Sequence, residues 1–150
     1  MQIDPNNKIV RICAEGMEAE GRGNIALAQK LFQGAWQDAD SDFEKFIAAH
    51  YQARNKADTR EELKWNLESL RWAALIPEDG MKVYFPSLHL SAGQSYEKLN
   101  DKENAELQYK SAATYLEYLP NDGYGNMIKN GITAALGRFR DVNLPILTTP

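Results

Sequence analysis

The sequence predicts an all-α fold of seven helices, on three observations. Apolar residues recur at intervals of three and four, as from Ile25 through Ala28 to Phe32, which is the spacing of one helix face. Residues that favour helix starts punctuate the chain, and no stretch alternates polar and apolar residues for long enough to indicate a sheet. We expect helices over residues 5–20, 25–38, 42–55, 60–75, 84–98, 102–117 and 123–138.

The helix starts are predicted from residues that can cap them. Ser41 with Glu44, and Thr59 with Glu62, have the spacing of capping boxes. In such a box the acid three residues on returns a hydrogen bond to the amide of the capping residue. The other predicted caps are Asp4 before Pro5, Asn24, Asp101, and Asn121 or Asp122.

The sequence repeats itself at a distance of 77 residues. Small and aromatic positions of the first and second predicted helices coincide with those of the fifth and sixth, as do the turns between the two helices of each pair. The matching positions are Gly16 and Gly93, Ala19 and Tyr96, Gly23-Asn24 and Asn100-Asp101, Ala28 and Ala105, Phe32 and Tyr109, and Ala35 and Ala112. Self-similarity of this kind indicates a helical repeat protein.

This pattern resembles the tetratricopeptide repeat, a 34-residue pair of antiparallel helices. Residues 9–42 and 86–119 fit its frame, whereas residues 43–85 fit less closely because the turn RNKADTR is too long. The resemblance implies one domain over residues 1–150, a right-handed superhelix of about three hairpins. A helix at 123–138 would cap the last hairpin, and the tail at 141–150 contains two prolines.

Four segments also resemble a group of small, poorly characterised bacterial repeat proteins: AAHYQAR, WNLESLRWA, PSLHLSAGQSYEKLND and YGNMIKNGI. Together they span most of residues 43–132. This resemblance supports a bacterial cytoplasmic source and implies no known activity. Proteins of this group sometimes carry enzyme names, including rRNA adenine methyltransferase.

Composition and charge narrow the choice of partner. The net charge of −4 argues against a nucleic-acid partner, because phosphate binding needs a concentrated basic face. The start MQIDPNNK lacks the features of a secretory signal, and no apolar run is long enough for a membrane span. A single cysteine, Cys13, fits a reducing cytoplasm.

The stretch EGRGN permits two interpretations, a phosphate-binding loop or the turn between two packed helices. A phosphate loop needs a preceding apolar strand and a further glycine or a Gly-Lys-Ser/Thr ending, which the stretch lacks. The turn is therefore favoured. His50 and His89 lie on first helices of adjacent hairpins, but no third metal ligand is evident. We expect no cofactor, no metal and no enzymatic activity.

In tetratricopeptide repeats the first helices line a concave groove, which implies a set of partner-binding positions here. They are Val10, Cys13, Met17, Phe43, Phe46, His50, Ser87, Leu90 and Gln94. This lining is mostly apolar, so the expected partner is an amphipathic helix or an extended apolar segment of a protein, and a carboxylate clamp is not expected. The alternatives are a homodimer or the chain's own tail that buries the groove, and an enzyme with a site near His50 and His89.

Overall fold

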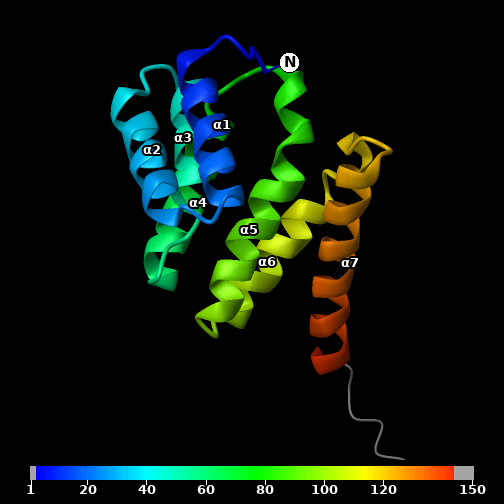
Figure 1. The fold of residues 1–150 in the computed structure, drawn as a ribbon. Helices are drawn as coiled ribbons and strands as arrows, with labels where there is room; N and C mark the ends of the chain where they lie inside the picture. The colour runs from blue at the N-terminus through cyan, green and yellow to red at the C-terminus, as the bar shows by residue number, and fades with distance from the viewer. Residues whose placement is uncertain (1–2, 144–150) are drawn as a thin grey trace, which may run out of the picture.

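The computed structural model describes residues 3–143, which form seven α-helices, two 3₁₀ helices and no strand (Figure 1). The prediction of an all-α fold is confirmed for this part of the chain. The α-helices are α1 (Lys8–Gly21), α2 (Ile25–Asp38), α3 (Asp42–Gln52), α4 (Thr59–Ala74), α5 (Phe85–Lys98), α6 (Lys102–Ala113) and α7 (Gly123–Asn143). The 3₁₀ helices are Asp79–Val83 and Leu116–Tyr118.

Four predicted helix starts are confirmed, at Asn24, Ser41, Asp101 and Asp122, and two are wrong. The α2 helix spans the predicted residues, and Ser41 and Glu44 form the capping box of α3. The α1 helix begins after Asn7, whose side-chain oxygen accepts from the amides of the next turn at 2.8 and 3.1 Å, rather than after Asp4. Likewise Asp58, not Thr59, caps α4, because its carboxylate accepts from the Arg60 amide at 2.9 Å.

Three helix ends differ from the prediction by more than one residue. The α3 helix stops at Gln52 instead of 55, and Asn55 then takes a left-handed conformation with φ 60°. The α6 helix stops at Ala113, and its chain continues as a 3₁₀ turn. The α7 helix runs on to residue 143, so the first part of the predicted tail is helical. Residues 144–150 of that tail lie outside the described part.

Close helix packing explains why glycine recurs at the 77-residue spacing. A Cβ atom on Gly16 would lie 2.3 Å from the Phe32 ring, and one on Gly93 would lie 2.5 Å from the Tyr109 ring. Both distances are shorter than two non-bonded carbon atoms can approach. Each aromatic ring therefore fills the space that a glycine leaves, once between α1 and α2 and once between α5 and α6.

The turns before α2 and α6 have the same backbone. Gly23 has φ 81° and Asn100 has φ 61°, both in the left-handed region that glycine and asparagine tolerate best. The following residues, Asn24 and Asp101, each accept an amide hydrogen from three positions on, at 3.2 Å. The interpretation of EGRGN as a turn between packed helices is therefore confirmed.

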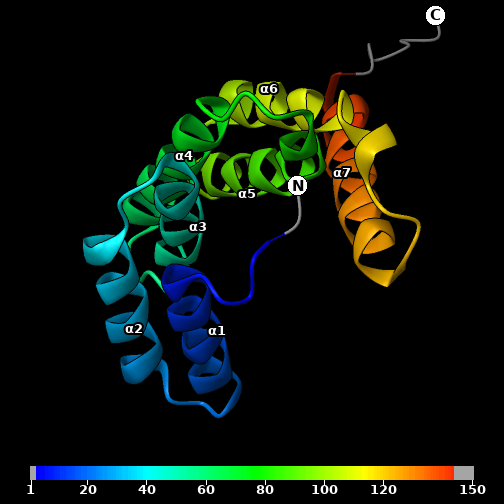
Figure 2. The ribbon, with the colours of Figure 1, turned by 90° about the horizontal axis from the view of Figure 1, so that it is seen from above.

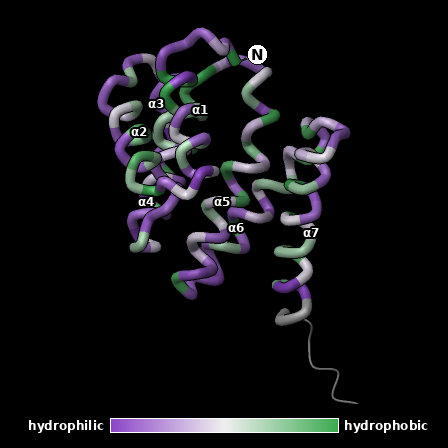
Figure 3. The backbone as a smooth tube through the Cα atoms, in the orientation of Figure 1, coloured by the Kyte–Doolittle hydropathy of each residue, from purple (hydrophilic) through white to green (hydrophobic). Residues whose placement is uncertain are grey.

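The helices form three successive pairs along an arc, and α7 packs against the last pair (Figure 2). The helices α1, α3 and α5 lie on the inner side of the arc, and α2, α4 and α6 lie on the outer side. Hydrophilic residues interrupt every helix (Figure 3). No helix within residues 3–143 combines the length and the apolar character needed to cross a membrane.

The buried core comprises three clusters, of which the smallest surrounds Phe32 between α1 and α2. One cluster joins the first two helix pairs and the start of α5, around Phe46, Met81 and Leu88. A second cluster joins the third pair to α7, around Tyr109 and Ile132. The second and third pairs meet mainly where α5 packs on α4. This junction positions the candidate site.

Candidate functional site

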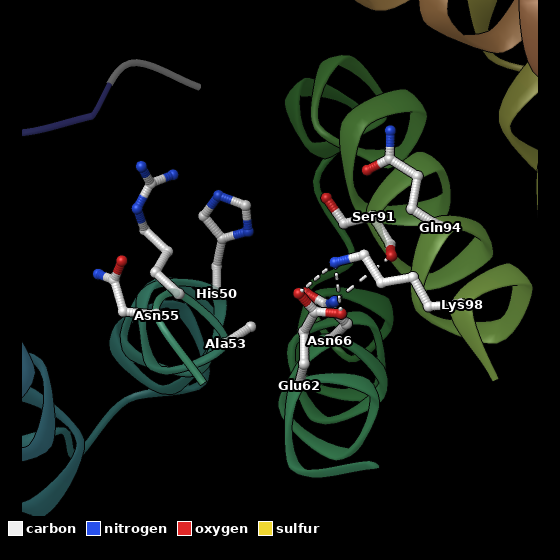
Figure 4. Close-up of a pocket in the computed structure, with 9 residues that line it drawn as sticks. His50, Ala53, Asn55, Glu62, Asn66, Ser91, Gln94 and Lys98 are labelled. Carbon is white, nitrogen blue, oxygen red and sulfur yellow. Dashed lines mark hydrogen bonds and ion pairs between the residues drawn. The ribbon is translucent and has the colours of Figure 1, made fainter. Parts of the chain in front are cut away.

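A polar cleft of about 230 Å³ lies between α3 and α5, with α4 as its floor (Figure 4). It exists because α5 packs extensively on α4 but not on α3. The inner ends of the two helix pairs are therefore separated. The cleft is lined by His50, Ala53, Arg54 and Asn55 from α3 and the following turn, Glu62 and Asn66 from α4, and Ser91, Gln94 and Lys98 from α5.

The floor of the cleft is a chain of hydrogen bonds between α4 and α5. The Asn66 amide donates to Ser95 Oγ at 3.0 Å, and Ser95 Oγ donates to Glu62 Oε2 at 2.8 Å. Lys98 Nζ donates to both oxygens of Glu62, at 3.0 and 3.2 Å. Asn66 and Ser95 are almost fully buried, so unpaired polar atoms at this place would be costly. The bonds fix how α5 sits on α4.

Arg54, a cation on the α3 side of the cleft, is paired with Glu20, which is not part of the cleft lining. Arg54 donates through Nε and Nη2 to the carboxylate of Glu20, and the Asn55 amide donates to the same carboxylate at 2.7 Å. The hydrogen bonds from Arg54 lower the pKa of the Glu20 carboxyl group. Arg54 Nη1 has no hydrogen-bond partner within residues 3–143, so its two N–H groups are available to donate.

His50 projects from α3 into the space between α3 and α5 (Figure 4). Its Nδ1 atom is buried and has no hydrogen-bond partner in the described part of the chain. Burial, with a smaller effect from Arg54, lowers the pKa of the imidazole to about 4, so the ring is neutral at pH 7. A buried N–H without a partner is rarer than an unpaired acceptor. We therefore assign the proton to Nε2.

The remaining side chains make the cleft rich in hydrogen-bond donors. Ser91 and Gln94 have no side-chain partner among the described residues, and Lys98 is more than half exposed. The one carboxylate in the lining, Glu62, already accepts from Ser95 and Lys98. An arrangement of free donors around an occupied acceptor is suited to binding a group that accepts hydrogen bonds.

The structure divides the nine predicted groove residues among several places. His50 and Gln94 line the cleft, and Met17 is 37% exposed on α1. Cys13, Phe46 and Leu90 are at most 7% exposed. These three belong to the core, which corrects the expectation that they line an open groove. The half-buried members of the set are Val10, Phe43 and Ser87.

The burial of those three residues has identifiable causes. Cys13 and Phe46 share a core cluster because α1 packs against α3. Leu90 is covered by α7, where a Cβ atom on Gly131 would lie 3.2 Å from Leu90 Cδ2. Burial raises the pKa of the Cys13 thiol to about 12, so this thiol is protonated and unreactive at neutral pH.

The two histidines do not share a site. His89 Nδ1 lies 2.7 Å from Gln108 Oε1 on α6, and its ring stacks on Tyr115 at 6.1 Å. It lines a separate crevice on the side of α4 and α6 with Phe85. Within residues 3–143, no three His, Cys, Asp or Glu side chains come together as metal ligands would.

Sequence reasoning missed most of the cleft lining. Arg54, Glu62, Asn66, Ser91 and Lys98 were not predicted to share a site. Asn66 was the one available signal, because in a repeat over residues 43–85 it would take the position that Ala28 and Ala105 hold in the outer copies. A buried amide at such a place needs a partner, and Ser95 supplies it.

Comparisons with known proteins give no family for this chain. No family model matches it, and no curated protein or solved structure is significantly similar to it. The evidence for a repeat therefore comes from this chain alone. It consists of the sequence pattern and of the contacts that Gly16 and Gly93 make with aromatic rings.

Proposed function

We propose that this chain is a cytoplasmic protein- or peptide-binding scaffold of the tetratricopeptide type. Its three hairpins would correspond to residues 9–42, 43–85 and 86–119, within a single domain. The support is the pair of glycine–aromatic contacts and the two left-handed turns, which recur at the same positions of the first and last hairpins. The α7 helix supports a capping role, because it packs on α5 and α6.

The observation that carries the binding role is the cleft on the inner side of the arc. Solenoids of helical hairpins bind partners along such inner surfaces. The donors of His50, Arg54 and Gln94 suit the carbonyl groups or the polar side chains of a bound segment. Apolar residues of the same segment would contact α1, where Met17 is exposed. We propose a non-enzymatic role, because His50 makes no hydrogen bond to a Ser, Cys or carboxylate side chain within the described residues.

The test selects peptides from a random display library against the wild-type protein and measures their affinity for variants. We expect Met17→Glu to weaken binding at least about tenfold, because a carboxylate would be buried against an apolar partner. Leu107→Glu is the matched control, since Leu107 is an exposed apolar residue of the outer helix α6. Failure to select any peptide, or equal effects of the two substitutions, would reject the scaffold.

A homodimer is the second candidate, favoured by one observation on α7. Tyr124 and Met127 lie one turn apart and are 48% and 61% exposed. Light scattering over a concentration series would show a dimer that Met127→Glu dissociates. A monomer at high micromolar concentration would remove this candidate.

A further inference from the structure

We infer that the cleft between α3 and α5 binds a compact anionic group, a phosphate or a carboxylate, that a ligand presents to it. This inference rests on the proposed binding role and names the chemistry that the inner surface recognises. It is carried by the free donors of the cleft and by the unpartnered imidazole of His50 (Figure 4).

Three side chains of the cleft carry hydrogen-bond donors that are free within residues 3–143. Arg54 Nη1, the Gln94 amide and the Ser91 hydroxyl have donor hydrogens without a protein partner in the described part of the chain. They come from both walls of the cleft, Arg54 from the α3 side and Ser91 and Gln94 from α5. An oxyanion accepts several hydrogen bonds at once and makes stronger bonds with cationic donors than a neutral group does.

Two cations and one carboxylate face the cleft. Arg54 and Lys98 are the cations of the lining, and Glu62 is its carboxylate. Glu62 is held by Lys98 and Ser95. Glu20 neutralises Arg54 from outside the lining. The lining itself is therefore not acidic, although the whole chain carries a net charge of −4.

The imidazole of His50 also lines the cleft. Nδ1 of His50 is buried and has no partner within residues 3–143, and Nε2 is the ring nitrogen to which we assign the proton. A neutral N–H donor on the α3 wall adds a hydrogen bond to a bound oxyanion. This bond would give the ring one hydrogen-bond partner, through Nε2, and would leave the buried Nδ1 unpaired.

The experiment follows amide and side-chain NMR signals of the whole chain at pH 7 while inorganic phosphate or acetate is added at constant ionic strength. We expect saturable shifts at His50, Arg54, Gln94 and Lys98 with at least one anion. The comparison of the two titrations identifies whether phosphate or carboxylate is preferred. Chloride added to the same ionic strength should leave these signals unchanged.

Two variants locate the site. Gln94→Ala removes an exposed donor without changing the charge, and Lys98→Met removes a cation. Each substitution should lower the affinity for the anion about fivefold or more. Lys110→Met is the matched control for Lys98→Met, because Lys110 is similarly exposed and also pairs with a glutamate. Thermal melting confirms that each variant is folded.

The inference is overturned if neither anion gives saturable shifts in the cleft, or if Lys98→Met and Lys110→Met have the same effect. These outcomes are separate from failure of the scaffold. If peptides bind in a way that depends on Met17 but no anion binds, the scaffold is supported and the anion site is rejected. If no peptide binds, the scaffold is rejected, and the NMR titration alone decides whether the cleft binds an anion.

Discussion

The ring of Phe32 occupies the place that a side chain on Gly16 would need, since a Cβ atom there would lie 2.3 Å from the ring. Gly16→Ala should therefore force the ring or the helices apart. We expect the free energy of unfolding to fall by about 1–3 kcal/mol, although alanine favours a helix by up to about 1 kcal/mol. Urea unfolding measures the change.

Gly34→Ala is the control for that substitution. Gly34 also lies inside a helix, α2, but a Cβ atom on it would meet nothing within 4 Å. This substitution should be neutral or stabilising by up to about 1 kcal/mol. Equal effects at the two glycines would contradict the packing explanation for the repeat.

The left-handed turn before α2 gives the second prediction. Gly23 has φ 81°, a conformation that costs a β-branched residue about 1–2 kcal/mol or more. Gly23→Val should lower the midpoint of urea unfolding accordingly, and Asn100→Gly should be tolerated because Asn100 already has a positive φ. Gly21→Val tests the interpretation, since Gly21 has open space and no positive φ. An equal loss at Gly21 would mean that strain in the turn is not the cause.

These features could be predicted from the sequence because they depend on local patterns. The spacing of Gly16 and Phe32 and the turn residue Gly23 recur at Gly93, Tyr109 and Asn100, and each forms within one hairpin. Helix ends were less predictable. At α4, Asp58 and Thr59 are both good capping residues, and the structure uses the first.

The candidate site could not be predicted in the same way, because it depends on how one hairpin sits on the next. Asn66 and Ser95 are 29 residues apart, and their hydrogen bond helps to place α5 on α4 and away from α3. The groove positions taken from the repeat pattern assume a regular stacking of hairpins. That assumption fails at Leu90. The repeat pattern predicts that this residue lines the groove, but α7 covers it.

The buried imidazole of His50 gives a prediction for pH. Its pKa falls from the ordinary 6.5 to about 4 in the folded chain, mainly because of burial. The unfolded chain then binds the proton first as the pH falls, so stability is complete above pH 6.5 and is lost progressively down to about pH 4. His50→Gln should flatten the pH dependence of the free energy of unfolding across this window.

The same histidine can be observed directly. NMR titration of the ring carbons should show that His50 stays neutral at pH 5.5, where an exposed histidine is largely protonated. A midpoint near 6.5 for His50 would contradict its burial, and an unchanged stability profile in His50→Gln would show that other groups set the acid sensitivity.

The polar junction between α4 and α5 gives the last prediction. Asn66→Ala removes the bonds to Ser95 Oγ at 3.0 Å and to the Ser91 carbonyl at 3.4 Å, and it leaves space beside a buried hydroxyl. We expect the free energy of unfolding to fall by about 1–3 kcal/mol. Asn104→Ala is the control, because Asn104 makes its side-chain bond to Asp101 at an exposed helix start. The control should change stability by less than about 0.5 kcal/mol. Since the junction also shapes the cleft, Asn66→Ala should move the NMR signals of Gln94 and His50, and signals that stay in place would show that the cleft forms without this bond.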